Sequence, residues 1–351
     1  MGNKKFKKKK KVAKKETKKH NRIEKELEKE KKNQNCELKM LLLGTGDSGK
    51  STFIKQMQIL YCDGFNRKDY TLYSSVIKLN CVGYIKTLLK ACDSLGYSLS
   101  KQKSRDRETF LNLIKESPHS YTNEIAKYVP SLWEDSSMKK CFQDRKLFQI
   151  PGSADYFLDK FEEIKEEDYK PKQKDILICR IPTTGLKELN LKINGLVWKF
   201  VDVGGQRSER RKWAHHFDDV DILIFVIALD CYSQKLFENN TINRMEESLS
   251  VFENIVNNDY FKKKDLVILF NKVDRFEKSL ENSPIKETFP DFNGLNNYEE
   301  GKEFFKNKFI EIVKKRNKRS IYPFFTCGIE TNDMKNVFEE IQKKLIKKTI
   351  H

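Results

Sequence analysis

Long apolar runs separated by helical patterns constrain the fold of this chain more than any other feature of its sequence. Four runs have the near-continuous apolar composition of buried strands: LKMLLLG (38–44), LVWKFVDVGG (196–205), DILIFVIAL (221–229) and DLVILFNKVD (265–274). SIYPFFTCG (320–328) is a weaker run, and LKELNLKI (186–193) alternates as an edge strand does. We therefore predict an α/β fold with a mostly parallel six-stranded sheet and helices on both faces.

Residues 63–172 contain no comparable strand run. YSSVIKLNCVGYIKTLLKACDSL, YTNEIAKYVPSLW and SADYFLDKFEEI instead carry apolar residues at helical spacing. We predict that residues 63–172 form an all-helical domain inserted into the α/β domain, which comprises residues 37–62 and 173–351. Residues 1–36 form a basic N-terminal tail or helix.

The positive charge of the chain is concentrated in this tail. The formal net charge is +18, and residues 1–32 hold 16 Lys and Arg against five Glu. Glu and Lys at helical spacing in RIEKELEKEKK favour an exposed helix, while the composition is equally typical of a disordered tail. The lysine run predicts contact with an anionic membrane surface. Nucleic-acid binding is the rival interpretation, and we do not expect it.

The cysteines and the hydropathy pattern indicate an intracellular protein. The eight cysteines form no CxxC pair and no close Cys/His cluster, so we expect neither a disulfide framework nor a zinc site. No run approaches the ~20 apolar residues that span a bilayer. The N-terminus has charges where a signal peptide needs its apolar stretch.

A glycine-rich loop, GTGDSGKS (44–51), follows the first apolar run and precedes the helical pattern TFIKQMQILY. It fits GxxxxGK[ST], in which glycines let backbone N–H groups surround an anion at the N-terminus of a helix. Lys50 can then reach the outer phosphates, and the Ser51 hydroxyl can bind Mg²⁺. Because strand and helix flank the loop, a chance turn is the weaker interpretation, and the loop predicts a nucleoside triphosphate of unspecified base.

The tetrapeptide Asn271-Lys272-Val273-Asp274 follows another apolar run and indicates guanine. Guanine presents N1–H and N2–H donors that a carboxylate at Asp274 can accept, whereas adenine would leave that acceptor unpaired. An unpaired buried acceptor costs about 1–3 kcal/mol, which is enough for selectivity. Alone, NKxD is also a common turn. Thr326-Cys327-Gly328 ends the last run, where its backbone could contact the base.

The segment Asp202-Val203-Gly204-Gly205-Gln206 follows the strand KFV. An Asp at the carboxyl end of a strand can support Mg²⁺ through water. The Gly205 N–H can meet a γ-phosphate, and Gln206 can orient an attacking water. On its own, the segment is also a plain β-turn with two glycines.

The ordered set GTGDSGKS, DILICRIPTTG (175–185), DVGGQRSERRKW (202–213), NKVD and TCG resembles that of heterotrimeric G-protein α subunits. The likeness runs from about residue 37 to the C-terminus, and RSERRKW distinguishes it from small Ras-like GTPases. It implies a Ras-like P-loop GTPase domain with an inserted helical domain, acting as a GTP/GDP switch with slow hydrolysis. It also implies Mg²⁺ as cofactor, a βγ dimer as partner in the GDP state, and a membrane receptor and effectors of unknown identity.

The resemblance also assigns roles. Arg180, Gln206 and Lys50 become the catalytic residues, with Arg180 as the built-in arginine finger, and Ser51 and Thr183 become Mg²⁺ ligands. The residues assigned to the nucleotide are Gly44, Thr45, Gly46, Asp47, Ser48, Gly49, Lys50, Ser51, Thr52, Ser153, Leu177, Ile178, Cys179, Arg180, Ile181, Pro182, Thr183, Asp202, Val203, Gly204, Gly205, Gln206, Asn271, Lys272, Val273, Asp274, Cys327 and Gly328. An alternative is a GTP-binding scaffold module with little or no hydrolysis.

Several positions depart from the family pattern. Asp47 stands where the family usually has Glu, Gly152 replaces a frequent Asp and Ile178 a frequent Arg, so we expect faster nucleotide release. Gly2 suits N-myristoylation, although Phe6 stands where the pattern prefers Ser or Thr. One acyl chain plus the lysine run would place the protein at the cytoplasmic face of the plasma membrane, with a cytosolic fraction. The basic C-terminal helix has no cysteine near its end, so we expect no pertussis-toxin-type ADP-ribosylation.

Overall fold

The computed structural model describes residues 37–117, 120–148, 150–236, 239, 241–314 and 319–349. The predictions for residues 1–36, including Gly2 acylation and membrane contact through the lysine run, lie outside these residues. Within the described ranges, no helix combines the length and the apolar composition needed to cross a membrane.

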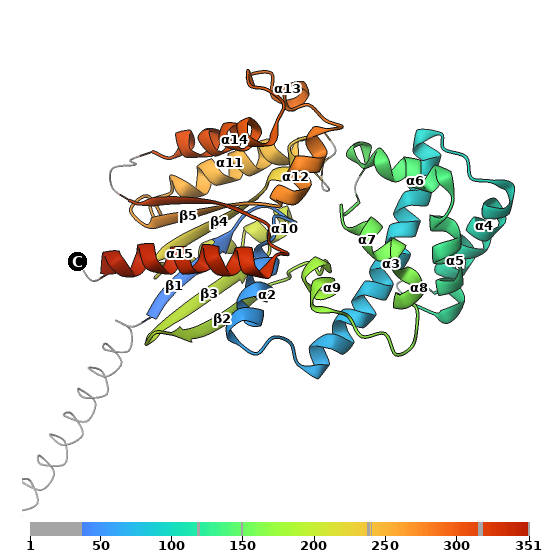
Figure 1. Ribbon diagram of the computed structural model, residues 1–351, viewed down its shortest axis with the longest axis horizontal. Helices are drawn as coiled ribbons and strands as arrows, with labels where there is room; N and C mark the ends of the chain where they lie inside the picture. The colour runs from blue at the N-terminus through green and yellow to red at the C-terminus, as the bar shows by residue number, and fades with distance from the viewer. Residues whose placement is uncertain are drawn as a thin grey trace, which may run out of the picture.

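The centre of the fold is a six-stranded sheet with the order β2-β3-β1-β4-β5-β6 (Figure 1). Neighbouring strands are parallel except for the β2–β3 pair, which is antiparallel. The strands are β1 (Glu37–Leu43), β2 (Leu186–Ile193), β3 (Leu196–Val203), β4 (Ile222–Ala228), β5 (Asp265–Asn271) and β6 (Ile321–Thr326). The predicted sheet and its edge strand are therefore confirmed.

The antiparallel edge strand follows from its two-residue turn. Asn194 and Gly195, with φ of 52° and 81°, join β2 to β3. Two residues with positive φ give a type I′ turn, whose twist matches that of the two strands, and Asn-Gly is its preferred sequence.

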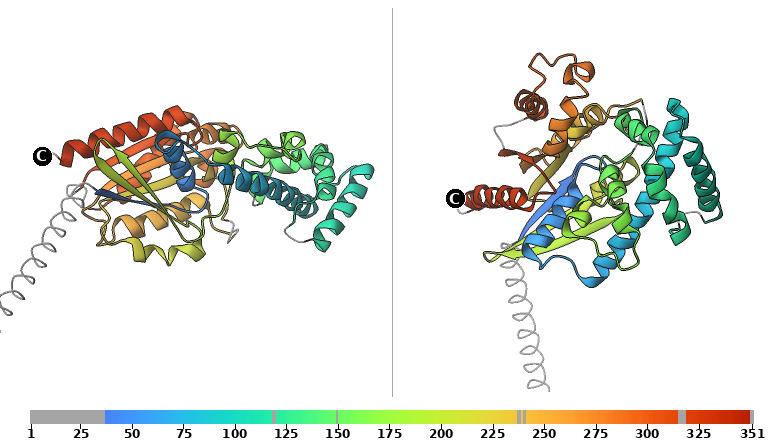
Figure 2. Two further views of the ribbon diagram at one scale, coloured as in Figure 1. Left: turned by 90° about the horizontal axis from the view of Figure 1, so that it is seen from below. Right: turned by 45° about the vertical axis from the view of Figure 1, so that its right-hand side comes forward.

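Helices cover both faces of the sheet, because successive residues of each parallel strand point to opposite sides. In β1, Met40 and Leu42 pack into one core and Leu41 and Leu43 into the other. The covering helices are α2 (Lys50–Tyr61) and α15 (Thr331–Thr349) on the first face, and α11 (Arg244–Val256) and α14 (Tyr298–Ile312) on the second. Figure 2 shows the sheet between these two layers.

A block of helices lies beside the carboxyl ends of the parallel strands (Figure 1). It contains α3 (Arg67–Leu95), α4 (Lys101–Glu116), α5 (Asn123–Trp133), α6 (Ser136–Gln143), α7 (Ala154–Asp159) and α8 (Phe161–Ile164). This helical block has a core of its own, in which Phe110, Phe157 and Phe161 are completely buried. Its long helix α3 begins in a capping box formed by Asn66 and Asp69.

The segment that returns the chain to the sheet is fixed by a buried carboxylate. Asp175, in α9 (Gln173–Ile178), accepts hydrogen bonds from the Tyr156 and Tyr169 hydroxyls and from the Lys160 ammonium. Burial alone would raise the pKa of Asp175, but the hydrogen bonds from Lys160 and Tyr156 lower it. The charged, fully bonded carboxylate therefore holds the end of the helical block against α9.

A buried lysine fixes the same segment from the sheet side. Lys55 of α2 donates to the carbonyls of Ile176 and Cys179, at 2.8 and 2.9 Å.

The remaining elements are α10 (Arg207–Arg210), α12 (Val273–Leu280), α13 (Ile285–Thr288), η1 (Arg145–Leu147), η2 (Trp213–His216) and η3 (Leu229–Cys231).

Candidate functional site

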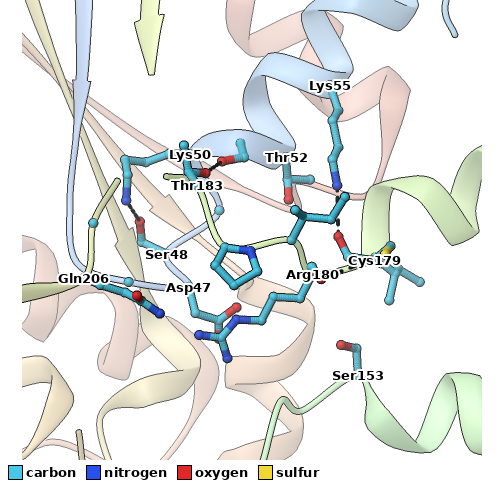
Figure 3. Close-up of a pocket in the computed structure, with 17 residues that line it drawn as sticks. Asp47, Ser48, Lys50, Thr52, Lys55, Ser153, Cys179, Arg180, Thr183 and Gln206 are labelled. Atoms are coloured by element: carbon cyan, nitrogen blue, oxygen red, sulfur yellow. Dashed lines mark hydrogen bonds between the residues drawn. The ribbon is translucent and has the colours of Figure 1, made fainter. Parts of the chain in front are cut away.

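Two adjoining pockets open between the sheet and the helical block. The first is lined by Gly46, Asp47, Ser48, Gly49, Lys50, Ser51, Thr52, Lys55, Ser153, Ile178, Cys179, Arg180, Ile181, Pro182, Thr183, Gly205 and Gln206. The second is lined by Asp47, Gly49, Thr52, Pro151, Gly152, Ser153, Leu177, Ile178, Asn271, Lys272, Asp274, Arg275, Gly328 and Ile329. Most of the predicted site residues therefore come together around one opening, and Figure 3 shows the first pocket.

The glycine-rich loop between β1 and α2 has a shape that requires glycine. Gly49 has φ of 108°, and a Cβ built there would lie 2.0 Å from the side-chain nitrogen of Asn271. That nitrogen donates to the Ser48 carbonyl at 2.9 Å. The NKVD segment therefore holds the loop from behind, and the bond leaves no room for a side chain at position 49.

Lys50 places a cation inside this loop. Its ammonium donates to the carbonyls of Gly44 and Thr45, both at 2.9 Å, and the residue is buried. Burial lowers the pKa of Lys50 to about 8, although the nearby Asp202 carboxylate opposes that shift. An anion in the pocket would remove this penalty, because it would neutralise the buried charge.

A cluster of oxygens forms beside the loop. The Ser51 hydroxyl lies 2.7 Å from the Thr183 hydroxyl and donates to Oδ2 of Asp202 at 2.7 Å. The other carboxylate oxygen of Asp202 is buried without a partner, and burial raises the pKa of this group. Hydroxyl and carboxylate oxygens are the ligand types that Mg²⁺ prefers, so these residues fit that ion.

The segment after β3 presses against the glycine-rich loop. A Cβ on Gly205 would lie 2.4 Å from the Lys50 ammonium and 2.6 Å from the Gly44 carbonyl oxygen. A Cβ on Gly46 would lie 3.5 Å from Cγ of Gln206. Gln206 and the Gly205 backbone therefore face the same end of the pocket as Lys50.

Asp47, which lines both pockets, is the centre of a charge network. Its Oδ2 accepts from Lys272 at 3.1 Å and from Arg244 at 3.3 Å. Arg244 also donates to the Gly46 carbonyl, at 3.2 Å. The Arg180 guanidinium extends beside Asp47, and Ser153 lies across the opening of the pocket (Figure 3). Among the described residues, no hydrogen bond or ion pair joins Asp47 to this guanidinium.

The second pocket is bounded by the segments predicted to read the base. Oδ1 of Asn271 accepts from the Gly328 backbone N–H at 2.9 Å and from the Thr326 hydroxyl. Burial, together with the neighbouring Asp274, raises the pKa of the Cys327 thiol to about 12, so this thiol stays neutral. Asp274 remains at the pocket wall as an acceptor for a ligand.

Some predicted residues lie behind the walls of the two pockets. These are Gly44, Thr45, Asp202, Val203, Gly204, Val273 and Cys327. Conversely, Lys55, Pro151, Arg275 and Ile329 line a pocket without having been predicted. Arg275 could have been suspected, because it directly follows NKVD; no motif marks Lys55 or Arg244.

A family profile described as "G-protein alpha subunit" matches residues 17–345. The chain belongs to this family. It is 39% identical over 317 residues to a protein named "Guanine nucleotide-binding protein alpha-17 subunit" from Caenorhabditis elegans, covering 89% of each chain. A "Guanine nucleotide-binding protein subunit alpha" from Emericella nidulans is 35% identical over 322 residues, 91% of each chain.

A G(o) subunit alpha from Locusta migratoria is 36% identical over 313 residues, 88% of each chain. The resemblance inferred from the ordered motifs is therefore confirmed. The predicted fold class is confirmed as well, since the six-stranded, mostly parallel sheet and its helices are those of a Ras-like domain with a helical insertion.

Proposed function

We propose that this G-protein α subunit is a GTP/GDP switch that hydrolyses GTP and transduces signals from a membrane receptor to effectors. Family membership supports GTP binding and signalling. The observation that carries the proposal is that two segments far apart in sequence contact one phosphate loop. Thr183 reaches it through Ser51, and Gly205 packs against Lys50.

The cofactor in this proposal is Mg²⁺. Ser51 and Thr183 would supply hydroxyl ligands, and Asp202, whose second oxygen is buried without a partner, would support the ion through water. When bound, Mg²⁺ would neutralise charge on the outer phosphates.

The hydrolytic roles follow from the surroundings of the γ-phosphate position. Gln206 would orient the attacking water, because it lies beside Gly46 of the phosphate loop and lines the same pocket as Lys50. Lys50 and Arg180 would stabilise the charge that develops on the phosphoryl oxygens. Arg180 suits this role because no partner among the described residues binds its guanidinium, and it lines the same pocket.

Loss of the γ-phosphate would then be a structural event. The phosphate would hold Thr183 and Gly205 in place, and its release would let both segments relax. Arg207 and Arg210, which follow Gly205 in α10, are now held by Glu247 of α11. Relaxation would therefore change the surface formed by α10 and α11.

The partners in this proposal are a βγ dimer in the GDP state, a receptor and an effector. Gly2 acylation and the N-terminal lysine run would bring the protein to the cytoplasmic face of the plasma membrane. We also propose that residues 37–62 and 173–351 form the Ras-like domain and that residues 63–172 form the inserted helical domain. The separate core of the helical block supports this division.

Single-turnover hydrolysis tests the catalytic roles. We expect the wild type to release γ-phosphate, and Gln206→Leu and Arg180→Cys to bind GTP with largely abolished turnover. Near-normal turnover in both variants would refute these roles, and absence of turnover in the wild type would favour the scaffold alternative. To test base selectivity, an excess of adenine nucleotide is added, and it should leave the binding of GTP unchanged.

A pull-down in GDP, repeated with GDP–aluminium fluoride, tests the partner. A βγ-like protein should be captured in the first state and released in the second. Equal capture in both states would contradict the proposed switch.

A further inference from the structure

We propose that Arg275 is a latch across the mouth of the nucleotide pocket, which closes on the backbone of Gly152 and slows nucleotide release. The inference rests on the proposed function, since it concerns the same pocket. It adds a residue that controls the nucleotide dissociation rate, and at position 152 it replaces the expectation of faster release with a glycine that leaves room for Arg275.

The first observation is a close contact between the two domains. Arg275 lies in the first turn of α12, directly after the NKVD segment, whereas Gly152 lies in the loop before α7 of the helical block. A Cβ built on Gly152 would lie 2.3 Å from Nη1 of Arg275 and 3.6 Å from Cζ. The guanidinium therefore occupies the place where a side chain at position 152 would begin.

Both ends of this contact are anchored. The Arg275 N–H donates to the Lys272 carbonyl at 3.1 Å, and the following Phe276 is completely buried. On the other side, the Ala154 N–H donates to the Pro151 carbonyl at 3.0 Å, and Ala154 is completely buried. The contact thus joins two fixed points, one on each domain.

The latch lies on the base side of the site. Arg275 and Gly152 line the second pocket together with Asn271 and Asp274, and neither lines the first pocket around Lys50. Opening the contact should therefore widen the exit next to the base and leave the phosphate contacts unchanged. The dissociation rates of guanosine di- and triphosphates should therefore change by the same multiple.

The guanidinium is free to act in this way. Among the described residues it has no hydrogen bond or ion pair, and the side chain is only partly buried. A planar cation can stack over backbone or a base while it stays partly hydrated. Gly152 has no positive φ, so its absent side chain is needed for space and not for backbone conformation.

Two substitutions test the latch by different routes. Arg275→Ala removes the guanidinium. Gly152→Ala keeps the charge but displaces it, and the protein should still fold because the atom in the way is the end of a flexible side chain. We expect each variant to raise the dissociation rate of fluorescent GDP about tenfold, with little change in association, since interface substitutions act mainly on dissociation. The double variant should match the single variants, because both break one contact.

The matched control is Lys278→Ala, which removes a cation from the exposed face of the same helix. It should leave the dissociation rate unchanged. A nonhydrolysable GTP analogue should show the same fold-changes as GDP in the Arg275→Ala and Gly152→Ala variants, and Lys278→Ala should keep the wild-type rate of single-turnover hydrolysis.

Wild-type dissociation rates in both Arg275→Ala and Gly152→Ala would overturn the latch while leaving the proposed function intact. Additive effects in the double variant would also overturn it, because they would indicate two separate causes. If the wild-type protein shows no saturable binding of guanine nucleotides, the proposed function fails instead.

Discussion

The ammonium of Lys272 lies 3.1 Å from Oδ2 of Asp47, so the NKVD segment and the glycine-rich loop are joined by an ion pair. Arg244 of α11 shares the same oxygen at 3.3 Å. Asp47 has φ of 62°, a conformation that aspartate tolerates better than most residues. Three segments distant in sequence are therefore held together at the pocket wall by one carboxylate.

This relationship predicts an acid-sensitive contribution to stability. Burial would raise the pKa of Asp47, but the charges of Lys272, Arg180 and Arg244 outweigh burial and lower it from 3.8. A lowered folded-state pKa stabilises the fold above the unfolded-state value, and this contribution is lost as the pH falls through the folded-state pKa. Asp47→Asn should reduce the free energy of unfolding at pH 7 by about 1–3 kcal/mol.

Urea unfolding without nucleotide at pH 7 and pH 3 measures this effect. The difference between wild type and Asp47→Asn should be smaller at pH 3. Asp69→Asn, at the capping box of α3, provides a control far from the network. An Asp47→Asn difference that grows toward pH 3 would contradict the assignment.

The contact between Gly46 and Gln206 predicts a graded loss of hydrolysis. A Cβ at Gly46 would lie 3.5 Å from Cγ of Gln206, which is an ordinary contact, so Gly46→Ala should be tolerated. The γ-carbons of Gly46→Val would extend into the space of Gln206 and misplace it. We expect about a 100-fold slower single-turnover rate for the valine variant, with GTP affinity retained. Equal rates for the two variants would argue against displacement of Gln206.

Replacement of Gly205 by alanine should give a variant that cannot reach the GTP conformation. A Cβ there would lie 2.6 Å from the Gly44 and 2.7 Å from the Thr45 carbonyl oxygen, and these backbone atoms cannot move aside. Gly205→Ala should keep GDP affinity but fail to bring this segment onto the phosphate loop. The reporter is Trp213, which is buried and whose indole N–H donates to the Gly204 carbonyl at 2.8 Å.

Tryptophan emission should change in the wild type when a nonhydrolysable GTP analogue replaces GDP, and should stay unchanged in Gly205→Ala. Gly83→Ala is the matched control, because a Cβ on Gly83, in α3, would have nothing within 4 Å. If the emission of Gly205→Ala changes as much as that of the wild type, the close contact at position 205 does not prevent the GTP conformation.

The sequence predicted the sheet because its strands are buried on both faces and therefore leave near-continuous apolar runs. It also marked the glycine-rich loop, which lies between β1 and α2 at the wall of the first pocket, because that motif depends on local spacing. The antiparallel direction of β2 is encoded just as locally, in the Asn194-Gly195 turn.

Lys55, Arg244 and Arg275 could not be assigned in this way, because their partners are distant in sequence. Arg244 meets Asp47 only after α11 packs beside the loop, and Lys55 meets Cys179 only after the chain returns from the helical block to the sheet. Arg275 meets Gly152 only when the two domains lie side by side. These contacts depend on tertiary packing, within the α/β domain for Lys55 and Arg244 and between the domains for Arg275, and no motif in the sequence records that packing.

The lowered pKa of Lys50 predicts that nucleotide binding takes up a proton from the buffer. Burial lowers its pKa to about 8, so about half of the molecules carry a neutral Lys50 at pH 8 before nucleotide arrives. Phosphates beside the side chain favour the ammonium and raise the pKa, because opposite charges stabilise the charged form. At pH 8, binding should therefore take up about half a proton from the buffer.

Calorimetric titration with GDP at pH 8, in two buffers of different ionisation enthalpy, measures this uptake directly. At pH 6 the ammonium is already formed in the free protein, so Lys50 should take up no proton there. Lys55, whose pKa burial also lowers to about 8, keeps its bonds to the Ile176 and Cys179 carbonyls and should not contribute. A binding enthalpy at pH 8 that is equal in both buffers would mean that the phosphates do not approach Lys50.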